Sequence, residues 1–335
     1  MSVRIGIIGT GWVTELHLAA LKTIDGAEVV AIAGRNPERA AKLAKPWKAK
    51  TYEKPLEMLS KETLDAVFIL LPPHLHGELE RACSEHVKGV LIEKPISRSL
   101  ETAQAIHSHF QNAGTIVSVA YQNRYRQSVQ TARKLFSEEG NQGILANGWW
   151  TTQMPPPLWW RSFDQSGGQF VEQCTHILDI CRYTMGDIDE VSAYATRGFM
   201  PEVKGKTVDD AMVVNARFAS GALASFSTGC FPLGGHSESP DGGIGLHLSS
   251  RKHRIYLTGW HFDGIVYSGE NDKESIPREE NIFAIQDKAF LDAIATGDSS
   301  GIHSNYEDSL KTLAATLAAN ESARNQAGTP VKVVV

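Results

Sequence analysis

Strands and helices are predicted to alternate through the first part of the chain, and this alternation constrains the fold more than any other feature. Short apolar runs indicate strands over residues 3–8, 28–33, 65–71, 89–92 and 116–121. Helical spacing of apolar residues follows most of them, over residues 12–24, 37–45, 75–86 and 100–113. Strands that alternate with helices form a parallel, doubly wound sheet, whose crossovers are almost always right-handed.

The pattern changes after about residue 122. Helices are indicated over residues 129–138, 170–185, 283–295 and 306–324. Strand-like runs separated by turn residues favour an antiparallel sheet; they cover residues 144–153, 189–197, 210–218, 222–229, 244–249, 253–259 and 264–268. We therefore expect an α/β protein with two domains, over residues 1–122 and 123–335, and the length of 335 residues also fits two domains.

Composition argues against several other classes of protein. The net charge of −5 gives no electrostatic reason to bind nucleic acid or an acidic membrane surface. The longest apolar run, at residues 66–71, is far too short to span a bilayer. Four widely spaced cysteines without a CxxC pair favour free thiols in a reducing cytoplasm over disulfides or a zinc site. We expect a cytoplasmic protein that binds no nucleic acid, membrane or metal.

The turn after the first strand resembles the GxGxxG pattern of dinucleotide-binding turns. Gly9 would allow the tight turn, and Gly11 would let the backbone approach a pyrophosphate at the helix N-terminus. Thr14 replaces the last glycine, which suggests looser packing or a hydroxyl near the phosphates. We therefore predict a Rossmann domain whose cofactor site includes Gly9, Thr10, Gly11, Trp12 and Val13. The alternative is a purely structural glycine turn.

The end of the second strand favours NADP over NAD. An NAD site usually has Asp or Glu there, to accept hydrogen bonds from the ribose hydroxyls. Gly34 cannot accept them, whereas Arg35 and, one turn later, Arg39 would pair with a 2′-phosphate. We expect NADP as the preferred cofactor, NAD as the second choice, and Asn36 in the same site. The alternative for Arg35 is a solvated surface side chain.

Two motifs follow later strands, at the edge of a doubly wound sheet where ligands bind. Leu71 ends the third strand and Pro72 follows it, and Glu93 and Lys94 follow the fourth; all four are assigned to the cofactor site. A lysine at this edge can donate to a substrate oxygen and relay a proton. The alternative for Lys94 is a solvated side chain.

Four motifs in one order resemble the Gfo/Idh/MocA oxidoreductases, a family that includes glucose–fructose oxidoreductase and inositol dehydrogenase. The motifs are GTGxxT at 9–14, PPxxH at 72–76, EKP at 93–95 and GGxxxExxxHxxD at 167–179. The resemblance covers essentially the whole chain. It implies a Rossmann domain and an α/β domain whose open, mostly antiparallel sheet often forms a dimer or tetramer interface. It also implies that Lys94 and His176 are catalytic and that His76 lies near the nicotinamide.

Three polar residues have the spacing i, i+4, i+7, which places them on one face of the helix expected over 170–185: Glu172, His176 and Asp179. His176 is expected to take the hydroxyl proton while hydride leaves the same carbon, with Glu172 orienting the imidazole. The alternative is a surface stripe with a hydrogen-bonded histidine. The family more often has Asp at position 172, and the extra methylene moves the carboxylate by about one bond length.

Tryptophans and arginines are the candidates for the substrate side. Trp160 would stack on the apolar face of a sugar, and core packing is the alternative for each Trp here. Strand alternation sends Trp149 and Trp150 to opposite faces of the sheet. Arg161 would bind an anionic group such as a uronate.

Two further residues follow the fifth strand and would line the pocket. Gln122 is assigned to the cofactor side and Arg124 to the substrate side, where a salt bridge is the equal alternative for Arg124.

These assignments predict reversible hydride transfer between NADP or NAD and a secondary hydroxyl of a sugar, cyclitol or related polyol. The substrate would contact Lys94, His176 and Glu172, and the enzyme would be a homodimer or homotetramer. Two alternatives stay open. One is a glycoside-cleaving enzyme that oxidises, eliminates and re-reduces with a tightly held cofactor. The other is a cofactor-sensing regulator without enzyme activity.

Overall fold

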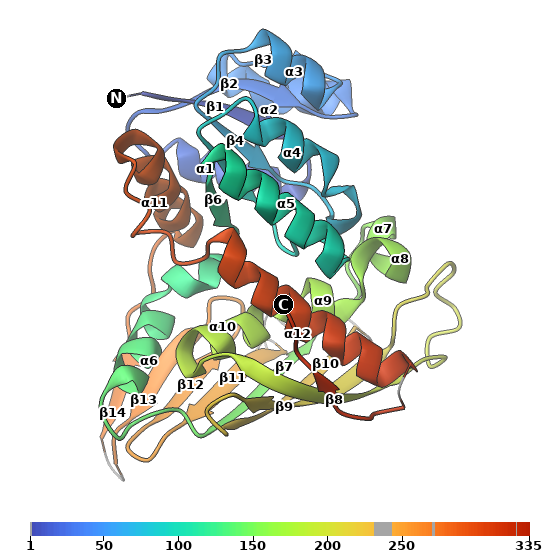
Figure 1. Cartoon of the computed structure of the whole chain (residues 1–335), viewed down its shortest axis with the longest axis vertical. Coiled ribbons are helices and arrows are strands. Elements are labelled where there is room, and N and C mark those ends of the chain that lie inside the picture. Colours follow the sequence, from blue (N-terminus) through green and yellow to red (C-terminus); the bar gives the residue numbers. More distant parts are fainter. Residues whose placement is uncertain (1, 231–242, 270–271, 326) are drawn as a thin grey trace. The chain divides into compact units, whose positions relative to one another are not determined.

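The computed structural model describes residues 2–230, 243–269, 272–325 and 327–335 (Figure 1). The chain divides into two units. Met1–Gln122 and Asn281–Ser309 form the first unit, and Asn123–Glu280 and Leu310–Val335 form the second. Residues 281–309 thus belong to the first unit although they follow most of the second in sequence, so neither unit is one continuous segment.

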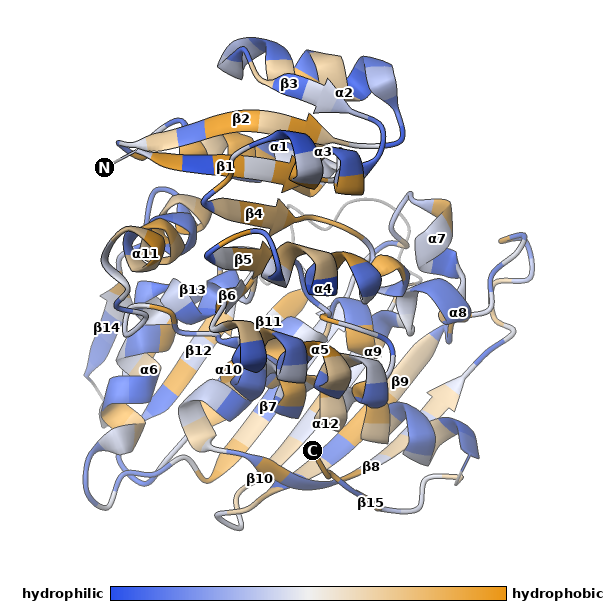
Figure 2. Cartoon of the chain, turned by 45° about the horizontal axis from the view of Figure 1, so that its top comes forward, coloured by the Kyte–Doolittle hydropathy of each residue, from blue (hydrophilic) through white to orange (hydrophobic). Residues whose placement is uncertain are grey.

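A six-stranded parallel sheet forms the centre of the first unit, with the strand order β3-β2-β1-β4-β5-β6. The strands are β1 (Val3–Ile8), β2 (Ala27–Ala33), β3 (Lys50–Tyr52), β4 (Ala66–Ile69), β5 (Gly89–Ile92) and β6 (Ile116–Val119). This is the strand order of a Rossmann fold, and the predicted doubly wound sheet is confirmed. Every residue of β4 and β5 is buried, as expected for central parallel strands covered on both faces (Figure 2).

Helices connect these strands, and one distant helix joins them. The helices in chain order are α1 (Trp12–Leu21), α2 (Pro37–Ala44), α3 (Pro55–Lys61), α4 (Glu78–Ser84), α5 (Leu100–Ala113) and α11 (Ile282–Thr296). Phe290, Leu291 and Ile294 of α11 belong to the apolar core of the sheet. The helix lies so close to β5 that a Cβ on Gly89 would be 2.3 Å from Cδ1 of Ile294. This packing explains why residues 281–309 belong to the first unit.

A nine-stranded sheet forms the second unit, with the order β14-β13-β12-β11-β7-β10-β9-β8-β15. The strands are β7 (Leu145–Thr151), β8 (Ile188–Thr196), β9 (Ala211–Phe218), β10 (Leu223–Gly229), β11 (Ile244–Ser249), β12 (Arg254–Thr258), β13 (Asp263–Tyr267), β14 (Lys273–Ile276) and β15 (Val331–Lys332). β7 and β10 pair in parallel, and the other neighbours are antiparallel. The predicted mostly antiparallel sheet is therefore confirmed.

Helices cover one face of this sheet (Figure 1), and the apolar core lies between these helices and the sheet. They include α6 (Gln127–Ser137), α10 (Thr175–Met185) and the C-terminal part of α12 (Tyr306–Asn325). A Cβ on Gly148 of β7 would be 2.5 Å from Cγ2 of Ile177, so the missing side chain lets α10 approach the strand. Along β9, buried and exposed residues alternate, as expected for a sheet covered on one face.

Two further properties concern the whole described chain. Among its described helices, none is both long enough and apolar enough to cross a membrane. The four cysteines are all buried and free, in agreement with the predicted free thiols.

Candidate active site

The turn between β1 and α1 has the geometry of a phosphate-binding turn. Gly9 has a φ of 120°, and a Cβ there would lie 2.2 Å from the carbonyl oxygen of Leu70, so only glycine fits. A Cβ on Gly11 would meet no atom within 4 Å, which leaves open space at the start of α1. Gly11 is the N-cap of α1, and no side chain caps the helix there. The residues present thus fit a dinucleotide pyrophosphate.

Thr14, in place of the third glycine of the motif, is buried inside the turn. Its Oγ1 donates to the carbonyl oxygen of Gly9 at 3.2 Å. The hydroxyl therefore ties the helix to the turn. Trp12 and Val13 form the first turn of α1, where Trp12 is exposed and Val13 is partly buried.

The loop after β2 and the start of α2 hold the three residues assigned to the ribose end, Arg35, Asn36 and Arg39. A Cβ on Gly34 would lie 2.5 Å from Cγ2 of Thr10, so Thr10 blocks a side chain at position 34. The side chain of Asn36 caps α2 by accepting from the backbone N–H of Arg39 at 2.9 Å. Arg39 donates to Glu15 at 3.1 Å on the exposed surface. Arg35 is exposed and has no ion-pair partner among the described residues.

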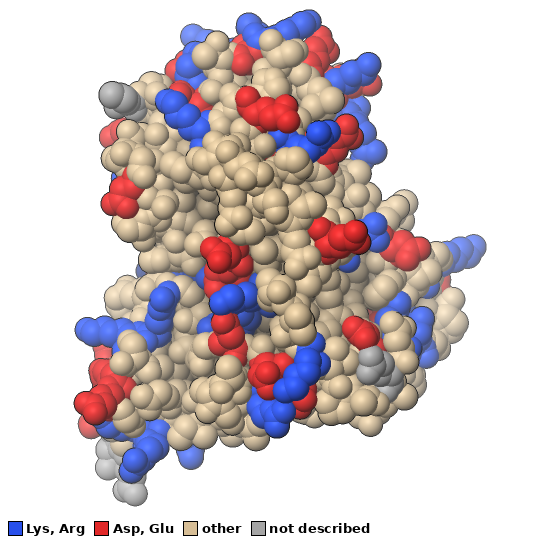
Figure 3. Space-filling view, viewed as in Figure 1, with Lys and Arg blue, Asp and Glu red and all other residues tan. Residues whose placement is uncertain are grey.

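Charged side chains of both signs are interspersed on one face of the molecule. Lys and Arg side chains alternate with Asp and Glu on the face shown in Figure 3. A mixed surface gives no broad field of one sign, so an anionic cofactor has to be selected by individual side chains.

The segment after β4 is fixed by a buried histidine. Nδ1 of His76 contacts Oε1 of Glu80, and its Nε2 lies 3.2 Å from the carbonyl oxygen of Leu71. The other oxygen of Glu80 accepts from the backbone N–H of Gly77 at 2.6 Å. His76 thus connects both ends of the segment that contains Pro72, and both of its ring nitrogens contact the protein.

Lys94 is the second residue after β5, at the carboxyl edge of the Rossmann sheet. Its backbone N–H donates to Oε2 of Glu93 at 3.1 Å, and Glu93 is only 8% exposed. Oε1 of Glu93 lies 3.5 Å from Nε2 of His17, a residue that the sequence analysis did not assign to the site. The signal was present, because His17 lies on the otherwise apolar inner face of α1 with Leu18 and Leu21.

In the second unit, the helix expected over 170–185 is interrupted. α9 (Gln169–Glu172) ends before α10 begins at Thr175, and Gln173 and Cys174 lie between the two. The backbone N–H of Cys174 donates to Gln169 rather than to the residue four positions earlier. Glu172 therefore ends one helix and His176 lies in the first turn of the next, so the single helix predicted over residues 170–185 is wrong. Gly186 ends α10 as expected.

Aromatic rings hold the two polar side chains of this segment. Trp160, in α7 (Leu158–Arg161), donates from its indole nitrogen to Oε2 of Glu172 at 2.7 Å. The imidazole of His176 stacks on Trp150, with the ring centroids 5.8 Å apart and 24° between the planes. Trp150 is buried, whereas Trp149 packs against His247 on the other face of the sheet, so the predicted alternation is confirmed.

The third member of the predicted polar stripe has a different role. Asp179 is buried and accepts two hydrogen bonds from Arg124, from Nε at 2.8 Å and from Nη2 at 2.6 Å. The hydroxyl of Thr312 on α12 donates to the same carboxylate at 2.7 Å. Arg124, within the short helix Gln122–Tyr125, is 2% exposed. The salt-bridge interpretation of Arg124 is therefore favoured over a substrate contact.

Trp160 and Arg161 are neighbours in different environments. Trp160 is 1% exposed and packs against Val208 and Cys230, so its ring is core and the prediction that it stacks on a sugar is wrong. Arg161 is half-buried, and its Nε has no hydrogen-bond partner among the described residues. Its backbone carbonyl accepts from Thr207 at 2.9 Å, which fixes the position from which the guanidinium extends.

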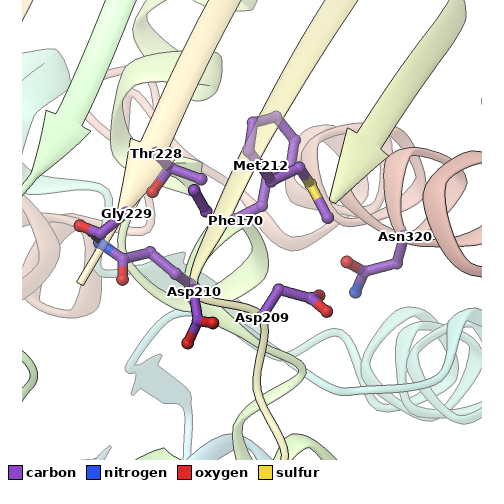
Figure 4. A pocket seen from close by; sticks show the side chains of 9 residues that line it. Phe170, Asp209, Asp210, Met212, Thr228, Gly229 and Asn320 are labelled. Atoms are coloured by element: carbon purple, nitrogen blue, oxygen red, sulfur yellow. Dashed lines mark hydrogen bonds between the residues drawn. The ribbon is translucent and has the colours of Figure 1, made fainter. Parts of the chain in front are cut away.

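A crevice beside α9 is lined by two acidic side chains, Asp209 and Asp210 (Figure 4). Its lining residues are Gln169, Phe170, Asp209, Asp210, Ala211, Met212, Thr228, Gly229 and Asn320. Asp209 pairs with Arg324 at 3.2 Å, and Asp210 pairs with Lys206. We assign this crevice no part in substrate binding, because its carboxylates are already engaged. Within the described ranges, no group of three or more His, Cys, Asp or Glu side chains is placed to hold a metal ion.

Known proteins resemble both units. Residues 3–121 match the model of the Gfo/Idh/MocA oxidoreductase family with its NAD-binding Rossmann fold, and residues 129–241 match the C-terminal domain model of the same family. The myo-inositol 2-dehydrogenase of Thermotoga maritima is 26% identical over 99% of this chain and 100% of its own length. The scyllo-inositol 2-dehydrogenase (NAD+) of Bacillus subtilis is 30% identical over 57% of each chain.

Solved structures have the same fold. Levoglucosan dehydrogenase in complex with NADH and levoglucosan matches with a TM-score of 0.86 and 22% identity, over 100% of both chains. An oxidoreductase from Agrobacterium radiobacter in complex with NAD+, L-tartaric acid and magnesium matches with a TM-score of 0.83 and 19% identity, over 99% of both chains. With both family models matched in order along one chain, this protein belongs to the Gfo/Idh/MocA family of oxidoreductases, whose N-terminal domain is an NAD-binding Rossmann fold.

Proposed function

We propose that this protein is a dehydrogenase that prefers NADP and acts on a secondary hydroxyl of a sugar, cyclitol or related polyol. The observation that carries the proposal is Lys94 at the carboxyl end of β5, in a sheet whose strand order and glycine turn fit a dinucleotide. The bound cofactor would supply the hydride acceptor, or the donor in the reverse direction. The names of relatives that act on inositols and levoglucosan support the substrate class.

Three side chains are proposed to act on the substrate. Lys94 would donate to the reacting oxygen from a backbone position that Glu93 fixes. His176 would take the hydroxyl proton, with its ring orientation set by stacking on Trp150. Glu172 would support the imidazole, and the indole N–H of Trp160 holds one of its oxygens. The hydrogen bond from Trp160 thus limits the positions that the longer side chain of Glu172 can adopt. The shorter side chain of Asp, which is more usual in the family, has fewer positions to adopt.

The cofactor preference rests on Arg35. An exposed guanidinium without a carboxylate partner in the described chain is available to a 2′-phosphate, whereas Arg39 already pairs with Glu15. Arg35→Ala should weaken NADP binding by about tenfold or more, because hydrogen bonds to charged groups contribute about 1.5–3 kcal/mol, and leave NAD binding almost unchanged. Dissociation constants from tryptophan fluorescence would measure this. Arg81→Ala, at an exposed arginine of α4, is the matched control. Tighter binding of NAD than NADP by the wild type would reject the preference.

We also propose that the outer face of the nine-stranded sheet joins two copies of the chain. Large side chains are exposed on its strands, including Tyr194, Val213 and Leu223. Trp149 and Tyr256 both contact the ring of His247. The ring centroids of Trp149 and His247 are 4.9 Å apart, and those of His247 and Tyr256 are 4.2 Å apart. Such apolar surface in a sheet is typical of an interface. Trp149→Arg should lower the mass measured by light scattering to that of a monomer; Leu158→Arg, outside the sheet, should not.

The reaction itself is tested with a panel of polyols, sugars and glycosides. A rise in reduced-nicotinamide absorbance that matches oxidised product would support the dehydrogenase. Product without any net change in absorbance would indicate a cofactor recycled in place, and tight cofactor binding without turnover would indicate a regulator. Lys94→Ala should abolish turnover and leave the melting temperature unchanged, because the half-buried side chain lies at the sheet edge; near-full turnover would reject its role.

A further inference from the structure

A buried histidine with two carboxylate neighbours lies next to the segment that carries Lys94. Nδ1 of His17 on α1 is 3.0 Å from Oδ1 and 2.9 Å from Oδ2 of Asp287 on α11. Its Nε2 is 3.5 Å from Oε1 of Glu93, whose other oxygen accepts the backbone N–H of Lys94. His17 and Asp287 are fully buried, and Glu93 nearly so. The contacts form a continuous path from α11 through α1 to the backbone of the lysine.

The arrangement favours a proton on both ring nitrogens of His17, although Nε2 makes no hydrogen bond within the described residues. Ionised carboxylates can only accept hydrogen bonds, and a neutral imidazole carries a single N–H. A neutral ring would turn a lone pair toward either Asp287 or Glu93 without water to screen it, which is costly in a protein interior. An imidazolium donates to Asp287 and forms an ion pair with Glu93, although 3.5 Å is long for a hydrogen bond.

The surroundings of His17 favour the charged ring. Burial alone would lower the pKa of His17, but the charge and hydrogen bond of Asp287, with smaller contributions from Glu93, raise it to about 9. These two carboxylates are the titratable groups that face the ring; burial raises the pKa of Asp287, and the charge and hydrogen bond of His17 oppose that rise. Its other neighbours are the edges of Phe68 from β4 and Phe283 from α11, with ring centroids at 5.6 and 5.2 Å, and both are uncharged.

We propose that His17 is a positioning residue: as a buried imidazolium it links Asp287 to Glu93 and so fixes the backbone from which Lys94 extends. The inference rests on the proposed function, because the position of Lys94 affects turnover only if Lys94 contacts the substrate. α1 also begins at the phosphate-binding turn. The same buried group therefore connects the cofactor turn and the lysine segment within one unit.

The first test compares the pH dependence of turnover. His17→Gln keeps a side-chain N–H donor but carries no charge. It should lower kcat/KM by about ten- to hundredfold, since small displacements of reacting groups have effects of this size. It should also remove the loss of kcat that we expect in the wild type as the pH passes about 9. His109→Gln, at an exposed position on α5, is the matched control and should keep the wild-type profile. A wild-type profile in His17→Gln would overturn the proposal.

The second test does not depend on turnover. NMR of histidines labelled with ¹⁵N gives the protonation state of each ring, and the signal missing from His17→Gln identifies His17. We expect His17 to stay protonated to about pH 9, and Glu93→Gln to lower that midpoint. A neutral His17 ring at neutral pH would overturn the inference even in an active enzyme. If the protein oxidises no polyol, the proposed function fails, and this titration alone decides the protonation of His17.

Discussion

Thr10 is predicted to decide which side chains position 34 accepts, and therefore which cofactor binds. The Cβ of an Asp at position 34 would lie 2.5 Å from Cγ2 and 3.1 Å from Oγ1 of Thr10. Overpacking of this kind costs about 1–3 kcal/mol. In a domain of this size, each kcal/mol lowers the melting temperature by about 2–4 °C. Gly34→Asp alone should therefore melt roughly 2–12 °C below the wild type and bind both cofactors weakly.

Removing the clash between Thr10 and the new side chain at position 34 should restore cofactor binding, with NAD preferred over NADP. Thr10→Ala keeps a Cβ, which lies 3.4 Å from the new one and so in ordinary contact. The double variant Thr10→Ala with Gly34→Asp should recover the melting temperature. Its carboxylate would then accept from the ribose hydroxyls and repel a 2′-phosphate, which favours NAD. Calorimetric melting and dissociation constants for both cofactors measure the two effects, with Thr10→Ala alone as control. The reasoning is refuted if Gly34→Asp melts like the wild type, or if the double variant still prefers NADP.

Three other predictions concern stability and the polar side chains of the site. Asp179→Ala should cost about 3–5 kcal/mol of unfolding free energy, because it removes the buried carboxylate that accepts two hydrogen bonds from the buried Arg124. Replacing both Asp179 and Arg124 by apolar residues (Leu and Met) should restore most of the lost unfolding free energy, as measured by urea titration. An Asp179→Ala variant as stable as the wild type would contradict this. Trp160→Phe keeps the apolar ring but removes the N–H donor to Glu172, so kcat should fall while the cofactor dissociation constant stays constant. An unchanged kcat would exclude that positioning role. The raised pKa of His17 contributes stability that is complete below about pH 6.5 and is lost as the pH rises through about 9. Melting curves of His17→Gln should lack this decline, and an equal decline in both proteins would contradict it.

Local sequence patterns predicted the individual strands and helices better than they predicted which of these elements pack against each other. The buried runs of β1, β4 and β5 and the alternating runs of the second sheet are visible in the sequence, because burial on two faces or one leaves a direct pattern. β3 was missed, because its three residues are exposed or partly so. The return of α11 to the first unit could not be predicted, since an apolar helical face does not specify which sheet it will cover.

In the candidate site, too, features set by local backbone geometry could be predicted from the sequence, whereas features set by packing partners could not. The glycine turn could be assigned from the sequence because glycine is required by backbone geometry, as at Gly9. The roles of Arg124 and Trp160 could not, because charged and aromatic side chains serve a buried core and a ligand equally well until their partners are known. The interruption between Glu172 and His176 was also hidden, since Gln173 and Cys174 carry no strong helix-breaking signal such as proline. His17 was overlooked, although a histidine on an apolar helix face is a visible feature.

The central claim is that this chain transfers hydride between a nicotinamide cofactor and a polyol, with NADP preferred. It is tested most directly by following reduced-nicotinamide absorbance while the purified protein, with NADP or NAD, meets inositols, anhydrosugars and sugar acids, with products identified by mass spectrometry. The account predicts that, for at least one polyol, absorbance rises in proportion to a product two hydrogens lighter, faster with NADP than with NAD. A product that forms while absorbance stays constant, or no product from any substrate despite tight cofactor binding, would contradict it.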